Sequence, residues 1–299
     1  MSLSISKATK KFGDFTAVDD ISLDVSEGQM HGFLGANGAG KTTTFRMALG
    51  LLAPTAGEVL WKGRSISYAD SPYIGYLPEE RGLYPKMKVQ EQLVYLARLR
   101  RMDKKQAELG AQEWLERFEV PHYANKKVEE LSKGNQQKIQ LIASLLHKPE
   151  LLILDEPFSG LDPVNVEMLK RAILDFQQQG ATIVFSSHRM DHVEELCDNM
   201  SILDKGKLIV HGSIRDVKRS FGKQNVRLYS DADITLLAGL PGIEKFTPQR
   251  SGAVFRIADE SVGQLLLTEA LKLGPVRQFA LEEPTLEEIF IEKVGRTDA

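Results

Sequence analysis

Short apolar runs alternate with helically spaced apolar residues over the first two thirds of the chain. Residues 151–154 form an uninterrupted apolar run, which is typical of a strand buried on both faces. The pattern predicts strands at 3–8, 21–25, 58–61, 151–154 and 182–185, helices at 41–52, 89–101, 104–118, 134–146, 164–179 and 190–196, and a hairpin at 202–210. This alternation predicts an α/β fold with a mostly parallel sheet and helices packed outside it.

Strand signals disappear between residues 79 and 149, where helical periodicity takes over. We therefore expect a helical subdomain inserted at about 79–149. It contains a basic cluster: Arg98, Arg100, Arg101, Lys104 and Lys105. We interpret this cluster as a solvated helix face because acidic residues interleave with it, and an interaction patch is the alternative.

A different pattern begins at Gly222. Strands are predicted at 225–229, 243–246, 253–257 and 276–280, with helices at 233–240 and 261–273. The order βαββαβ predicts a small ferredoxin-like α+β domain, and an amphipathic helix follows from Thr285. The predicted domains are therefore 1–221 and 222–299. The second lacks clustered nucleophiles, metal ligands and glycine loops, so we interpret it as an accessory or regulatory domain.

Composition excludes several classes of protein. The chain has 299 residues, of which 42% are hydrophobic, and a formal net charge of −3, so no basic surplus suggests nucleic acid as the main partner. The single cysteine, Cys197, excludes an intramolecular disulfide. No apolar run approaches the roughly 20 residues of a membrane helix, and the start does not resemble a signal peptide. We expect an intracellular protein that contacts a membrane only through a partner.

A phosphate-binding loop is predicted between a short apolar strand that ends at Leu34 and the helix that follows it. Gly35, Gly40, Lys41 and Thr42 fit the pattern GxxxxGK[ST]. A glycine-rich turn that matches by chance is the alternative, and the strand and helix on either side argue against it. The residues expected to bind ATP here are Gly35, Ala36, Asn37, Gly38, Ala39, Gly40, Lys41, Thr42 and Thr43. Lys41 would reach the β- and γ-phosphates, and the Thr42 hydroxyl would bind Mg²⁺.

Two carboxylates and a histidine follow later strands of the same sheet. Asp155 ends the buried run 151–154, so it can hold Mg²⁺ opposite Thr42. The next residue, Glu156, can orient or deprotonate the attacking water. His188 comes after the next strand and can hydrogen-bond the γ-phosphate. We therefore expect Glu156, His188 and Lys41 to be the catalytic residues.

The segment LSKGNQQK, at residues 131–138, indicates which phosphate-loop family is present. It resembles the signature LSGGQ of the nucleotide-binding subunits of ATP-binding-cassette (ABC) transporters. The match extends to SGLD at 159–162, which resembles the D-loop that contains Asp162. It also extends to His188 and to Phe12, which would stack on adenine. The resemblance covers residues 3 to about 220 and implies the fold of a P-loop NTPase ABC cassette, with a β-subdomain and a helical subdomain.

The resemblance implies an ATPase that works as a dimer with ATP and Mg²⁺. Each ATP would lie between the phosphate loop of one subunit and the signature of the other. The signature residues that would contact the partner's ATP are Ser132, Lys133, Gly134 and Asn135. It also implies a second nucleotide-binding subunit, which we expect to be a copy of this chain, and a separate transmembrane permease. The expected position is at the inner face of the cell membrane, and no nucleic acid is expected as a partner.

The sequence departs from the family pattern at two places. Lys133 replaces a glycine and Asn135 replaces a glutamine in the signature, while the serine and the second glycine are retained. Glu79 stands after Pro78 where the family has glutamine in the loop that touches Mg²⁺ or the attacking water. Glutamate keeps an oxygen ligand but loses the amide donors. Our hypothesis is that Glu79 still lies on the metal side of the site, together with Thr42 and Asp155.

The C-terminal segment EEPTLEEIF resembles bacterial ABC-2-type export ATPases of the drug, sodium and antibiotic efflux class. The leading hypothesis is therefore a motor subunit that drives export through a separate permease. The alternative is a soluble ABC ATPase that acts on ribosomes or nucleic acid. Such proteins usually carry two cassettes, long coiled coils or zinc motifs, and none of these is present in this sequence. A degenerate cassette is disfavoured because the lysine, both carboxylates and the histidine are all present.

Overall fold

The computed structural model describes residues 2–80, 82–222 and 224–295. The chain divides into two compact units, Met1–Gly212 and Ser213–Ala299. The division falls before the predicted boundary at 221/222, because helix α7 (Ile214–Phe221) packs against helix α9 (Leu286–Val294). The sequence prediction missed α7, a short helix whose buried side chains are Ile214 and Val217.

A six-stranded sheet forms the centre of the first unit, with the strand order β5-β6-β7-β3-β8-β9. The bounds are β5 (Ile74–Leu77), β6 (Leu151–Leu154), β7 (Thr182–Ser187), β3 (Met30–Leu34), β8 (Asn199–Asp204) and β9 (Lys207–Ser213). Neighbouring strands from β5 to β8 are parallel, which confirms the predicted parallel sheet. Strands β3, β6 and β7 are buried along their whole length, as their apolar runs predict.

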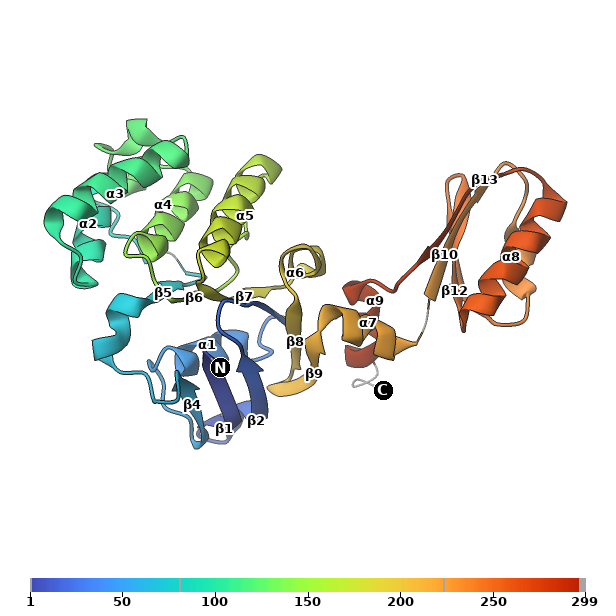
Figure 1. The fold of residues 1–299 in the computed structure, drawn as a ribbon, viewed down its shortest axis with the longest axis horizontal. Coiled ribbons are helices and arrows are strands. Elements are labelled where there is room, and N and C mark those ends of the chain that lie inside the picture. Colours follow the sequence, from blue (N-terminus) through green and yellow to red (C-terminus); the bar gives the residue numbers. More distant parts are fainter. Residues whose placement is uncertain (1, 81, 223, 296–299) are drawn as a thin grey trace. The chain divides into compact units, whose positions relative to one another are not determined.

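Two layers cover this sheet. Helices α4 (Lys133–Leu145), α5 (Pro163–Gln178) and α6 (Met190–Leu196) lie on one side of it, as Figure 1 shows. Helix α1 (Lys41–Ala48) lies on the other side, next to an antiparallel sheet of β2 (Phe15–Val25), β1 (Leu3–Phe12) and β4 (Ala56–Trp61). One hydrophobic cluster joins these parts and contains Val18, Phe33, Phe45 and Trp61.

The predicted helical subdomain is made of α2 (Val89–Leu99), α3 (Lys104–Arg117) and α4, with short 3₁₀ turns η2 (Pro121–Tyr123) and η3 (Val128–Glu130). These helices lie where helical periodicity predicts them. Their packing against each other buries Leu93 and Leu115 almost completely.

Two sequence predictions in the first unit are wrong in detail. Helix α1 ends at Ala48 rather than at Leu52, because Gly50 has a positive φ of 67° and reverses the chain. Strand β5 was not predicted, since it is only four residues long and contains Gly75. A Cβ atom on Gly75 would lie 2.4 Å from the carbonyl oxygen of Ser144, so glycine lets β5 approach α4. The strand follows the 3₁₀ turn η1 (Tyr68–Tyr73).

The second unit has the predicted ferredoxin-like topology. Its strands are β10 (Gln224–Ser230), β11 (Ile243–Gln249), β12 (Gly252–Ile257) and β13 (Val276–Glu282). They form an antiparallel sheet in the order β11-β12-β10-β13, and helix α8 (Glu260–Leu273) packs on it. The helix predicted at 233–240 is a 3₁₀ turn, η4 (Thr235–Gly239). In the described ranges, no helix combines the length and the apolar character that crossing a membrane requires.

A buried polar cluster joins three neighbouring strands of the first unit. Nε2 of His31 lies 2.9 Å from Oγ of Ser201, and that oxygen lies 3.1 Å from Nδ1 of His211. His31 is fully buried, and burial lowers its pKa to about 3, with a smaller contribution from His211. His31 therefore stays neutral in the folded protein at a pH where an exposed histidine is protonated.

We predict that acid destabilises the first unit through His31. Below pH 6.5 the unfolded chain binds a proton that folded His31 does not bind, so the free energy of unfolding falls as the pH falls. A pKa of about 3 in the folded state predicts a loss of about 1.4 kcal/mol between pH 7.5 and 5.5. In His31→Gln, which keeps a hydrogen-bonding group, the free energy of unfolding measured in urea should fall by about that much less than in the original chain over the same pH range. An equal fall in the free energy of unfolding in the variant and the original chain would contradict this prediction. The second unit, which has no histidine, is the internal control.

Candidate active site

The loop between β3 and α1 has the shape of a phosphate cradle. Gly40 immediately precedes α1 with φ of 104°, and a Cβ atom there would lie 2.7 Å from the carbonyl oxygen of Ala17. In the structure, Nζ of Lys41 donates hydrogen bonds to the carbonyl oxygens of Gly35, at 2.8 Å, and Ala36, at 3.2 Å. The amine is thus held within the loop, where phosphate oxygens would replace the carbonyls as its acceptors.

A cavity of about 450 Å³ lies in front of this loop. Its lining contains the loop residues 37–43 together with Phe15, Ala17, Glu79, Asp155 and Glu156. Three strands far apart in the sequence, β3, β5 and β6, therefore bring their predicted site residues to one place. Glu79 is exposed and lines this cavity, and its place on the metal side of the site stays a prediction.

Asp155 is held between two hydroxyl groups. The Thr42 hydroxyl donates to Oδ2 at 2.7 Å, and the Ser186 hydroxyl donates to Oδ1 at 2.6 Å. The carboxylate is almost fully buried, so these donors compensate its loss of hydration. Carboxylate and hydroxyl oxygens are also the ligands that Mg²⁺ prefers.

The described residues contain no cluster of three or more His, Cys, Asp or Glu side chains that could hold a metal ion. This fits Mg²⁺ in a nucleotide site, since Mg²⁺ there is bound by one or two carboxylates and takes its other ligands from phosphate and water. Thr42, Asp155 and Glu79 all border the cavity or bond to one another, so these oxygen donors fit the ion.

Glu156 combines a strained backbone with a buried carboxylate. Its φ is +50°, a left-handed conformation that is uncommon for residues other than glycine. Its backbone N–H donates to Oγ of Ser186 at 2.8 Å, and Nδ1 of His188 donates to its Oε2 at 2.8 Å. Oε1 is buried and has no hydrogen-bond partner among the described residues. It is the one oxygen of this carboxylate that lacks a hydrogen-bond donor in the described part of the chain.

Burial raises the pKa of Glu156, while the neighbouring His188 and, more weakly, Lys41 lower it. A carboxyl whose pKa is raised toward neutrality is a stronger base than an exposed glutamate. In the structure His188 therefore acts on Glu156 directly, in addition to any contact that it makes with phosphate.

Ser186 is the site residue that sequence reasoning missed. The predicted strand ended at Phe185, whereas β7 continues to Ser187. The fully buried Ser186 hydroxyl connects the Asp155 carboxylate to the Glu156 backbone. The available signal was a polar residue at the end of a buried strand at the same sheet edge as Asp155.

The predicted signature residues lie outside the cavity that contains Lys41. Ser132 is exposed and caps the N-terminus of α4, where its Oγ accepts a hydrogen bond from the backbone N–H of Asn135 at 3.4 Å. Lys133 is exposed, and Gly134 and Asn135 are half-buried. The dipole of α4 makes this terminus suitable for an anion. Asp162 likewise caps α5 by accepting from the N–H of Asn165 at 3.0 Å.

Known proteins share this arrangement along almost the whole chain. A family model described as ABC transporter matches residues 18–159, and one described as ATP-binding protein DrrA1-3-like, C-terminal domain, matches residues 212–294. The uncharacterized ABC transporter ATP-binding protein YhaQ of Bacillus subtilis is 60% identical over 295 residues, which is 98% of each chain. The chain belongs to the family of ABC transporter ATP-binding proteins.

More distant relatives cover the accessory domain as well. The linearmycin resistance ATP-binding protein LnrL of Bacillus subtilis is 31% identical over 96% of each chain, and the bacitracin transport ATP-binding protein BcrA of Bacillus licheniformis is 32% identical over 96% of this chain and 95% of its own. A solved ATP-binding subunit of an ABC transporter superposes with a TM-score of 0.70 at 28% identity, covering 74% of this chain and 94% of that one. The expected cassette fold and ATPase class are therefore confirmed.

Two phenylalanines of this ABC ATPase are candidates for the residue that stacks on adenine. Phe12 and Phe15 face each other across the turn between β1 and β2, and their side chains are 51% and 64% exposed. Phe15 lines the phosphate cavity, whereas Phe12 does not. The amine of Lys10 lies 5.3 Å from the centre of the Phe12 ring. The exposed Phe12 ring beyond the cavity remains our proposed adenine contact, and Phe15 closes the phosphate end.

We predict that Phe12→Ala raises the KM for ATP by about tenfold, because stacking of a base on an aromatic ring contributes about 1–3 kcal/mol. Phe15→Ala should raise it by no more than about twofold. Steady-state ATPase assays on both variants measure the difference. The opposite ranking would assign the adenine to Phe15.

Proposed function

We propose that two copies of this chain form a dimer that binds and hydrolyses two ATP molecules between them. The observation that supports this proposal is that the phosphate-binding cavity and the signature residues lie apart within one chain. Lys41, Asp155 and Glu156 share a cavity, while the signature lies on an exposed helix end outside it. A second subunit would bring its Ser132 and Gly134 to the γ-phosphate, as the family resemblance implies.

Each residue of the site has a role in this proposal. Lys41 and the loop N–H groups hold the phosphates, and Thr42, Asp155 and Glu79 would hold Mg²⁺, which would supply positive charge against the phosphates. Glu156 orients the attacking water through Oε1 and accepts its proton, while His188 fixes the other oxygen of Glu156. ATP then favours the closed dimer, and its hydrolysis removes that preference.

We further propose that the dimer drives export through a separate permease and reaches the membrane only through it. Two relatives that align over nearly the whole chain, including the accessory domain, are named for linearmycin resistance and bacitracin transport. Action on ribosomes or nucleic acid is the second candidate, and the net charge of −3 supports it less.

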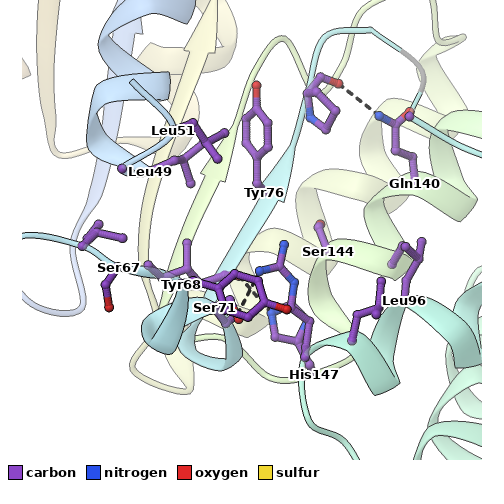
Figure 2. Close-up of a pocket in the computed structure, with 18 of the residues that line it drawn as sticks. Leu49, Leu51, Ser67, Tyr68, Ser71, Tyr76, Leu96, Gln140, Ser144 and His147 are labelled. Carbon is purple, nitrogen blue, oxygen red and sulfur yellow. Dashed lines mark hydrogen bonds between the residues drawn. The ribbon is translucent and has the colours of Figure 1, made fainter. Parts of the chain in front are cut away.

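A second cavity of the first unit, of about 500 Å³, is suited to the permease. In Figure 2, Leu49, Leu51 and Tyr68 lie on one wall, and Leu96, Gln140 and Ser144 lie opposite. Its rim is apolar and exposed: Leu51 is 67%, Tyr68 81% and Leu99 48% exposed. Exposed apolar rims of this kind mark protein contact sites.

Arg100 gives this groove a charge preference. Its guanidinium is half-buried and donates to the carbonyl oxygen of Ser71 at 3.1 Å, but it pairs with no carboxylate of the described residues. Burial lowers the pKa of Arg100, and Tyr68 raises it by a smaller amount. We therefore propose that the occupant is an amphipathic cytoplasmic helix of the permease that carries a carboxylate for Arg100.

Glu156→Gln tests the composite ATP site. We predict that hydrolysis falls by at least about 100-fold, since a positioned general base contributes 10²–10⁴. The uncharged glutamine should also leave ATP in place, so a dimer should persist in gel filtration with ATP and Mg²⁺ and separate without ATP. A variant that stays monomeric with ATP, or that hydrolyses it at the original rate, would refute the composite site.

Arg100→Glu tests the groove. In co-expression with the permease proposed here, we predict at least a tenfold loss of co-purification, because like charges repel across the interface. Arg98→Glu is the matched control, since Arg98 is an exposed arginine of the same helix end that does not line the groove. ATPase activity of both isolated variants should be unchanged. Equal co-purification of the two variants would exclude Arg100 as a docking residue.

A further inference from the structure

Gln140 connects helix α4 to the segment that carries Glu79. Its Nε2 donates hydrogen bonds to the carbonyl oxygens of Pro78, at 3.2 Å, and Glu80, at 3.0 Å. Figure 2 shows Gln140 at the end of the groove with one of these bonds. The two carbonyls belong to the residues on either side of Glu79, so one amide group holds the backbone of this segment from both sides.

The orientation of the Gln140 amide follows from its surroundings. Two carbonyl oxygens can be satisfied only by the NH₂ group, so the amide cannot be reversed without creating two repulsive contacts. Its Oε1 is then buried without a partner among the described residues. An unpaired buried acceptor is unfavourable, and the side chain adopts this orientation because it makes both bonds to the Glu79 segment.

Helix α4 also contacts the segment that follows the other catalytic carboxylate. Nε2 of Gln137 donates to the carbonyl oxygen of Pro157 at 3.1 Å, one residue after Glu156. Both glutamines are buried, and the helix that carries them starts at the signature residue Ser132. One rigid helix therefore links the surface that meets the partner's ATP to both loops of its own site.

We propose that Gln140 is a positioning residue that holds Glu79 at the ATP cavity and makes its position depend on helix α4. A displacement of α4, caused by a permease helix in the groove or by a second subunit at Ser132, would then move Glu79. This inference rests on the proposed function for the role of Glu79, and it adds a connection between groove and metal side that the site residues themselves do not make.

The purified full-length chain tests this with Gln140→Met, which keeps the length of the side chain and removes its donors. We expect the kcat for ATP to fall about tenfold, since small displacements of a positioned group are costly, with little change in KM. Gln177→Met is the matched control: Gln177 also bonds a helix to a backbone carbonyl, that of Gly28 at 2.8 Å, away from the ATP cavity. Its kcat should be unchanged.

A double-mutant cycle shows whether Gln140 acts through Glu79. In a Glu79→Ala background, Gln140→Met should cause no further loss of kcat, because the group that it positions is absent. A full additional tenfold loss, or no effect of Gln140→Met in the original chain, would overturn the proposal. Gln140→Leu, which also lacks the amide donors and buries no charge, provides the same comparison if the methionine variant is unstable.

Amide hydrogen exchange separates this inference from the proposed function, because it needs no hydrolysis. Peptides covering residues 74–80, whose protected amides lie in strand β5 directly before the held segment, should exchange at least about tenfold faster in Gln140→Met than in the original chain, and at the original rate in Gln177→Met. Unchanged exchange in Gln140→Met would overturn the inference even if the ATPase model holds. Faster exchange in a protein that neither dimerises nor hydrolyses ATP would refute the proposed function and leave the bond to the Glu79 segment established.

Discussion

The buried carboxylate of Asp155 organises the site. It lies where β3, β6 and β7 end at one sheet edge, and it takes one hydrogen bond from Thr42 and one from Ser186. An uncompensated buried carboxylate would cost several kcal/mol, so both hydroxyls must be in place for the sheet edge to close around it. Thr42 lies in α1 and Ser186 in β7, so this requirement fixes the phosphate loop relative to strand β7. The same oxygen donors then suit a divalent ion.

Glu156 combines a left-handed backbone with a carboxylate oxygen that has no hydrogen-bond partner among the described residues. A left-handed backbone at a residue other than glycine costs about 1–2 kcal/mol, and it persists where surrounding bonds determine it. Here the bonds come from Ser186 to the backbone and from His188 to one carboxylate oxygen. Because only one oxygen is satisfied, the strained turn presents the other without a partner. This unpartnered oxygen is unfavourable for folding, and our proposal that Glu156 orients water rests on it.

The sequence predicts the parts of this structure that depend on local pattern. Apolar runs identify β3, β6 and β7, and the residues that follow them identify Lys41, Asp155 and Glu156. What it does not predict depends on contacts between distant segments. Strand β5 was missed because it is short, contains a glycine and gains its stability from pairing with β6, which lies far along the chain. Ser186 and Gln140 were missed because a serine at a strand end or a glutamine in a helix has no pattern until its acceptors are known.

Helix α4 makes the cassette responsive as well as catalytic. A single hydrogen bond of the kind that the Gln140 side chain donates contributes about 1 kcal/mol net to stability. The two bonds to the Glu79 segment and the one from Gln137 therefore amount to roughly 3 kcal/mol. Coupling energies between sites are commonly 1–3 kcal/mol, which corresponds to a 5–150-fold change in an equilibrium. The bonds are thus strong enough to carry a displacement of α4 to the Glu79 segment, as the proposed role of Gln140 requires.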